Sequence, residues 1–162
     1  MSEKRKFFLI LLLISVLATV GFIFYNSTLP PTDSQEQSSA VWDIISGIIP
    51  PDSELFLFLK IYLRKIAHFT EYGLLGIELA LIAFFFAKRK PTAALFSFFS
   101  ALSVSVADES IQVFSGRGAS VVDVWIDVGG FVFFFVLSFT VLFFCTFYSS
   151  HQRKDKIRAL TP

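Results

Sequence analysis

Four long runs of apolar residues dominate the chain, and short polar or charged stretches separate them. These runs cover residues 7–25, 66–87, 92–114 and 121–147. A helix that crosses the hydrocarbon core of a bilayer needs roughly 17 to 25 such residues, so each run is long enough to span a membrane. The pattern predicts an all-α, polytopic membrane protein, a four-transmembrane-helix bundle that forms one domain over residues 1–162.

The segment between the first two runs changes character along its length. It begins as a polar loop rich in proline and serine and becomes apolar at Val41. From there Trp42 and several isoleucines recur at helical spacing until Pro50 and Pro51 break the element. A second short segment, residues 53–64, leads into the second run. We predict two short interfacial helices between the first two spans, with a plain loop as the alternative to the first.

The composition supports the membrane class and excludes others. The chain is 54% hydrophobic, which is too apolar for an ordinary soluble domain. Phenylalanine occurs 22 times, often in consecutive groups that suit a lipid-facing helix. The single cysteine, Cys145, can form no intramolecular disulfide. The sequence shows no phosphate-binding loop, zinc-ligand spacing or nucleic-acid motif, so we expect no nucleic-acid partner.

The basic residues predict the orientation. The first run follows Lys4, Arg5 and Lys6 and is longer than the core of a cleaved signal peptide, so we interpret it as an uncleaved anchor. With a cytoplasmic N-terminus, ten of the 14 basic residues lie inside and four lie outside. We therefore predict that both termini are cytoplasmic and that residues 148–162 form a basic cytoplasmic tail.

Polar and ionisable side chains stand at the ends of three apolar runs. In a four-span topology the start of the second run, the end of the third and the start of the fourth meet at the extracytoplasmic face. Ionisable groups at membrane depth are costly and usually face a bundle interior or a water-filled cavity. We therefore predict one polar site at that face. Its candidate residues are His68, Glu71, Asp108, Glu109, Gln112, Arg117, Asp123 and Asp127.

Some of these residues have local interpretations as well. His68 and Glu71 are three residues apart on one helix face, so they can pair with each other. Taken singly, Arg117 can cap its turn, Asp123 and Ser120 can cap the last helix, and His68 can snorkel to the interface. Glu78, deeper in the second run, is interpreted as a packing residue that hydrogen-bonds to serines of the third run.

Two motifs resemble the VanZ-like family of bacterial membrane proteins. They are RKIAHFTEY at residues 64–72 and DESIQVFSGRGASVVDVWIDVGG at residues 108–130. The resemblance extends over about residues 26–130 and implies a multi-pass protein of the bacterial cell membrane. It marks Lys65 together with the eight candidates named above. Ile111 departs from the pattern, because many members have histidine there, and a role that rests on that histidine is absent here.

The resemblance also implies a function. The family's namesake confers low-level resistance to the glycopeptide teicoplanin, and one proposal makes such proteins enzymes that act on lipid headgroups. The implied partners are membrane lipids, a lipid-linked cell-wall precursor or a glycopeptide antibiotic. In an enzyme, His68 would serve as general base or nucleophile with Glu71 orienting its ring, the other carboxylates would act as acids or hold a cation, and Arg117 would grip a phosphate oxygen.

Electrostatics adds a condition to the enzymatic function. Five carboxylates would repel an anionic phosphate unless several of them are protonated or a divalent cation bridges them, so an enzyme acting on a phosphate-linked lipid is expected to require Mg²⁺, Mn²⁺ or a similar ion. A non-enzymatic scaffold that binds a cell-wall lipid, an antibiotic or a partner protein is the alternative. A transporter is the third function, but no comparable chain of polar residues continues past Glu78 to the cytoplasmic side.

Overall fold

The computed structural model describes the backbone of residues 2–160 and the side chains of residues 2–32, 39 and 41–152. This part of the chain is helical and contains no strand. Its helices are α1 (Glu3–Thr28), α2 (Pro31–Ser46), α3 (Glu54–Phe86), α4 (Lys90–Phe114) and α5 (Val121–Leu160). Four of them, all except α2, contain stretches long and apolar enough to cross a membrane. The predicted all-α bundle with four spans is therefore confirmed.

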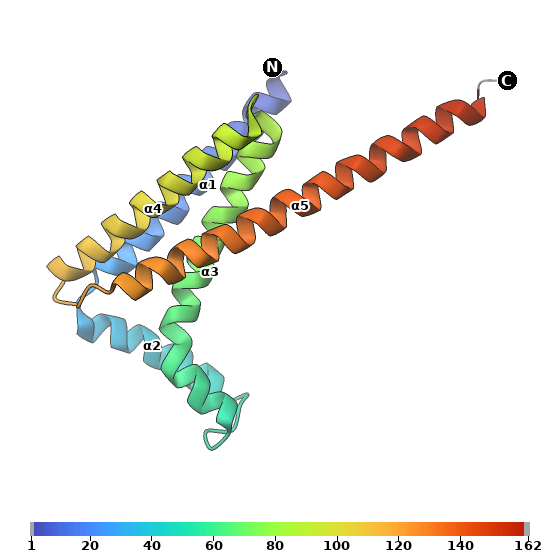
Figure 1. Ribbon diagram of the computed structural model, residues 1–162. Coiled ribbons are helices and arrows are strands. Elements are labelled where there is room, and N and C mark those ends of the chain that lie inside the picture. Colours follow the sequence, from blue (N-terminus) through green and yellow to red (C-terminus); the bar gives the residue numbers. More distant parts are fainter. Residues whose placement is uncertain (1, 161–162) are drawn as a thin grey trace.

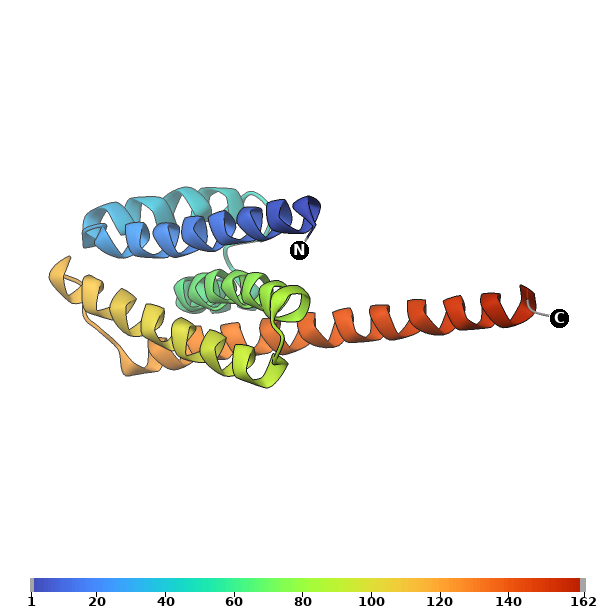
Figure 2. The ribbon, with the colours of Figure 1, turned by 90° about the horizontal axis from the view of Figure 1, so that it is seen from above.

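Helix α3 lies at the centre of the bundle and packs against α1, α4 and α5. Figure 2 shows this as three layers, with α1 and α2 on one side of α3 and with α4 and α5 on the other. In Figure 1, α5 crosses α3 at a steep angle, and its C-terminal half projects beyond the other helices. The buried core comes mainly from α3 and α5, with Ile23 and Ala101 added by α1 and α4.

Two glycines allow the backbones of α3 and α5 to approach each other closely. A Cβ atom on Gly76 of α3 would overlap the backbone of Phe131, and one on Gly130 of α5 would overlap the backbone of Phe69. Small residues permit such contacts between membrane helices, where packing replaces the hydrophobic effect as the driving force. The contact between Gly130 and Phe69 holds the start of α5 against α3 next to His68.

Substitution of Gly130 by alanine is expected to separate these two helices. Because the new methyl group meets backbone rather than a movable side chain, overpacking should cost about 1–3 kcal/mol of stability. Gly129→Ala is the matched control, since a Cβ atom there meets nothing within 4 Å. Thermal unfolding of both variants in detergent tests the difference. Equal melting temperatures would show that the close approach does not contribute to stability.

The ends of several helices differ from those predicted. Helix α2 begins at Pro31 rather than near Val41, because a proline at the first helical position is already set for a helix. Residues 54–64 are continuous with α3, which begins after the N-cap Ser53, whose hydroxyl accepts a hydrogen bond from the Phe56 amide at 3.2 Å. No proline or glycine then interrupts the helix before the apolar run.

Helix α5 also continues past its apolar run. It extends through the predicted tail as far as Leu160, whereas residues 161–162 lie outside the described part of the chain. The sequence after Gly130 contains no proline or glycine until Pro162, so nothing in it stops the helix where the hydrophobic pattern stops.

Candidate functional site

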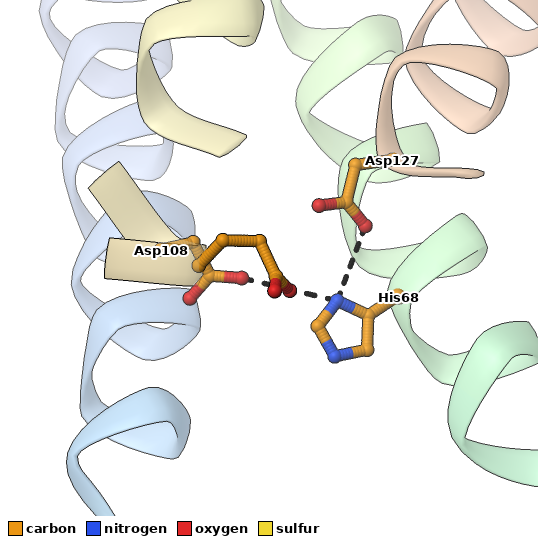
Figure 3. A group of neighbouring side chains, drawn as sticks. His68, Asp108 and Asp127 are labelled. Atoms are coloured by element: carbon orange, nitrogen blue, oxygen red, sulfur yellow. Dashed lines mark hydrogen bonds and ion pairs between the residues drawn. The ribbon is translucent and has the colours of Figure 1, made fainter. Parts of the chain in front are cut away.

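His68 lies between two buried aspartates from different helices. Its Nδ1 atom is 3.1 Å from Asp127 Oδ1 of α5 and 3.8 Å from Asp108 Oδ2 of α4. Both aspartates are fully buried, and the His68 side chain is only 12% exposed. Figure 3 shows the two carboxylates directed toward the same edge of the imidazole ring. Three helices that are distant in sequence thus deliver their polar groups to one point.

Glu109 completes a group of side chains that could hold a metal ion. One donor atom from each of His68, Asp108, Glu109 and Asp127 lies within 4.8 Å of the other three. We call these four residues the His68 cluster. Carboxylate oxygens combined with one imidazole nitrogen form a donor set that suits a divalent cation such as Mg²⁺ or Mn²⁺, and the imidazole also suits zinc. Of the carboxylates expected to hold a cation, Asp108, Glu109 and Asp127 belong to this group, whereas Asp123 does not and His68 takes its place.

Hydroxyl groups hold the two aspartates in place. Ser105, one turn before Asp108 on α4, donates a hydrogen bond to Asp127 Oδ2 at 2.7 Å. Ser27, at the end of α1, donates to Asp108 Oδ1. Hydrogen bonds of this kind orient the ligands of metal sites and fix which oxygen faces the centre. All four spanning helices therefore contribute to the arrangement around His68.

Gln112 connects the cluster to an arginine that the sequence did not identify as a site residue. Its amide nitrogen donates to Glu109 Oε1 at 3.0 Å and to Asp108 Oδ2 at 3.4 Å. Its amide oxygen accepts a hydrogen bond from Arg64 Nη2 at 2.6 Å. The backbone N–H of Ser120 donates to the other oxygen of Glu109 at 2.7 Å. Gln112 is thus a fully buried relay between the carboxylates and Arg64.

The only ion pairs of the three cluster carboxylates among the described residues join Asp108 and Asp127 to His68, and these balance charge only when the histidine is protonated. Within the described part of the chain, no lysine or arginine forms an ion pair with Asp108, Glu109 or Asp127. Neutral donors satisfy the hydrogen bonds of the carboxylates but leave their charges in place. Because buried charges of one sign are costly, protons or a bound cation must compensate them.

A second arginine lies near the cluster in the turn between α4 and α5. Arg117 Nη1 donates to the Asn26 carbonyl at 3.0 Å, while its Nε–H is buried and has no hydrogen-bond partner among the described residues. Burial lowers the pKa of Arg117 from its ordinary value, and the neighbouring Arg64 guanidinium adds to this effect. The two guanidinium groups thus repel each other at the edge of an acidic cluster.

Family comparison agrees with the motifs in the sequence. A family model described as VanZ/LLP1 matches residues 8–144, which is most of the chain. The chain belongs to the VanZ/LLP1 family. The matched region contains the whole His68 cluster and both arginines, and it confirms the resemblance inferred from residues 64–72 and 108–130. Neither the curated proteins nor the solved structures gave a match.

Two predicted members of the site have other positions in this VanZ/LLP1 protein. Glu71 accepts a hydrogen bond from Asn26 at 3.3 Å, and His68 is bonded to Asp127 instead. The local pair between His68 and Glu71 was therefore wrong, because the close packing of α5 on α3 places Asp127 against the ring. Asp123 is one turn before Asp127 and lies outside the His68 cluster.

Two smaller interpretations can also be compared with the structure. Ser120 caps α5, since its hydroxyl accepts a hydrogen bond from the Asp123 amide at 3.4 Å. Glu78 is buried, but its partners are Ser15 at 2.5 Å and Thr19 at 3.0 Å, both on α1. The predicted bonds to serines of the third run were wrong, because the face of α3 that carries Glu78 packs against α1.

Arg64 is the residue that the sequence analysis missed. Its position near the end of a span is typical of an interface anchor, so the pattern alone does not mark it as a site residue. The signal that could have identified it is its spacing, because Arg64 precedes His68 by four residues and so shares its helix face.

Proposed function

We propose that this VanZ/LLP1-family protein is a cation-dependent enzyme that acts on phosphate-linked lipid headgroups at the extracytoplasmic face of the bacterial cell membrane. The observation that carries this proposal is the convergence of His68, Asp108, Glu109 and Asp127 within 4.8 Å. A divalent cation there would neutralise the carboxylates and polarise a phosphate oxygen. His68 then serves as a ligand rather than as the general base, because its Nδ1 faces the carboxylates.

The two arginines provide the anion-binding half of the site. A guanidinium group presents a planar fork of N–H donors that matches phosphate geometry. The buried Nε–H of Arg117 lacks a partner among the described residues, and an unsatisfied buried donor costs free energy that a bound phosphate would recover. A bound anion would likewise relieve the repulsion between Arg64 and Arg117.

The position of the site supports a lipid substrate. With both termini in the cytoplasm, the ends of the helices that carry the cluster lie at the outer headgroup region. Phospholipids and lipid-linked cell-wall precursors present their phosphates at that depth. The same face is accessible to a glycopeptide antibiotic, so tolerance of teicoplanin is the cellular effect to measure alongside lipid turnover.

Removal of divalent cations is expected to stop headgroup turnover by the purified protein in lipid nanodiscs. Since cation catalysis supplies several kcal/mol of transition-state stabilisation, the rate should fall by about 100-fold or more and return when Mn²⁺ or Mg²⁺ is added back. Phosphorus NMR of the lipids measures the turnover directly. Undiminished turnover after exhaustive chelation would contradict the cation requirement, whereas cation binding without any turnover would favour the non-enzymatic scaffold.

A further inference from the structure

A groove runs between α1 and α3, and one of its lining residues, Glu71, lies one helical turn after His68 on α3. Its volume is about 390 Å³, which lies within the range of roughly 300–1,000 Å³ that is usual for small-molecule pockets. Three residues of α1 and three of α3 line it. They are Ala18, Thr19, Phe22, Thr70, Glu71 and Leu74.

The polarity of the groove changes along its length. Glu71 lies at the end near the cluster, one turn of α3 from His68, and accepts a hydrogen bond from Asn26 at 3.3 Å. Ala18 and Leu74 lie farther into the span and are apolar. The remaining wall is also less polar than its composition suggests, because both threonine hydroxyls are already bonded to protein groups.

The hydroxyl bonds are specific. Thr70 donates to the carbonyls of Ile66 and Ala67 on its own helix, at 3.0 and 2.8 Å. Thr19 donates to Glu78 at 3.0 Å. The O–H donors of both threonines are therefore occupied, so each threonine offers a ligand its methyl group and, at most, a hydroxyl oxygen as acceptor. Apart from Glu71 at one end, the groove presents an apolar surface to the lipid.

We infer that this groove binds an acyl chain of the phospholipid whose headgroup lies at the His68 cluster. The identity of this phospholipid as the ligand rests on the proposed headgroup chemistry. The groove is polar at the end near the cluster and apolar farther into the span. A phospholipid has the same order, with a polar headgroup followed by apolar acyl chains. Glu71 connects the groove to the His68 cluster, because it lines the groove and lies one turn from His68 on α3. Phospholipid acyl chains surround every spanning helix in a bilayer, so they are the ligand at highest local concentration.

A second groove in the bundle provides a matched control. It has a volume of about 290 Å³ and is lined by Lys90, Ala94 and Phe135 among others. Lys90 begins α4, whereas Asp108 lies near its other end, about 27 Å away along the helix axis. An acyl chain in this second groove would therefore belong to a lipid whose headgroup is remote from the cluster.

The inference can be tested with phosphatidylglycerol that carries a photoreactive diazirine in the middle of one acyl chain. After illumination in nanodiscs, cross-links mapped by mass spectrometry are expected to concentrate on residues 18–22 and 70–74. Ala18→Trp fills the groove and should reduce this labelling several-fold. Leu74→Trp, from the opposite wall, should do the same, which guards against misfolding of a single variant. Ala94→Trp, in the second groove, should leave the labelling unchanged.

Labelling requires no turnover, so its outcome is independent of the proposed reaction. Two results would contradict binding of an acyl chain in the groove without affecting the proposed headgroup reaction. One is uniform cross-linking along all lipid-facing helices, and the other is equal labelling of Ala18→Trp and the unmodified protein. Concentrated labelling without any headgroup turnover would contradict the reaction alone. Stronger labelling by a diazirine-bearing polyprenyl phosphate than by phosphatidylglycerol would overturn the assignment of the occupant.

Discussion

Asp127→Asn is expected to weaken Mn²⁺ binding to the purified protein by at least about 100-fold, since even the partners that merely orient metal ligands change affinity by about 10–100-fold when removed. Asparagine preserves the shape of the side chain and can still accept the hydrogen bond from Ser105. It removes the negative charge and can place an amide nitrogen opposite His68, where no cation can be held. Electron paramagnetic resonance of a Mn²⁺ titration measures free and bound ion directly.

Asp123→Asn is the matched control for this change. Asp123 is the same residue type on the same helix, one turn before Asp127, and lies outside the His68 cluster. Its substitution should alter Mn²⁺ affinity only slightly. An equal loss of Mn²⁺ affinity in both variants would indicate a general effect of negative charge at this end of the bundle. Normal affinity in Asp127→Asn would remove Asp127 from the set of ligands.

The stability of the same variant separates a cation site from a hydrogen-bonded scaffold. Without cations, the carboxylates of the cluster repel each other, and neutralising one relieves that repulsion. Chelated Asp127→Asn should therefore unfold at the same temperature as the chelated original protein or above it. In a scaffold, where Asp127 contributes mainly through its hydrogen bond with His68, the variant weakens that bond and should unfold at a lower temperature.

The sequence predicted the spans well because a bilayer leaves the backbone few choices. A segment without water must satisfy its own N–H and C=O groups, so apolar runs such as residues 66–87 and 92–114 form helices. The helix ends were harder to predict. Hydrophobicity shows where lipid surrounds the chain, whereas a helix stops at a breaking residue, so α5 continues to Leu160 and α2 begins at Pro31.

The clustering of polar side chains at the candidate site was predictable as a region but not as a set of contacts. Topology alone brings the ends of three spans together, which is why the four members of the His68 cluster were all among the candidates. Which side chains touch depends on how each helix is rotated and how closely it packs. The contact of Gly130 with Phe69 decides that His68 meets Asp127 rather than Glu71, and no pattern along the chain records such a distance.

Arg117→Gln is expected to weaken binding of a phosphate-bearing headgroup by about 10–100-fold, because a charge-assisted hydrogen bond contributes about 1.5–3 kcal/mol. The change should appear mainly as a higher KM for lipid turnover, since the cation ligands remain in place. Isothermal titration with a short-chain phosphatidylglycerol gives the affinity without turnover. Lys60→Gln is the control, because Lys60 is an exposed basic residue on α3, one turn before Arg64.

Arg117 also has a structural contact, so its role must be separated from packing. Its Nη1 donates to the Asn26 carbonyl, and losing that bond could loosen the end of α1. A diacylglycerol, which has the same chains without the phosphate, should bind Arg117→Gln and the unmodified protein equally if the arginine acts on the phosphate. Arg117→Lys keeps the charge but loses the planar fork, so it should recover only part of the affinity for phosphate. An equal loss of affinity for both lipids would show that Arg117 stabilises the fold and does not bind the phosphate of the headgroup.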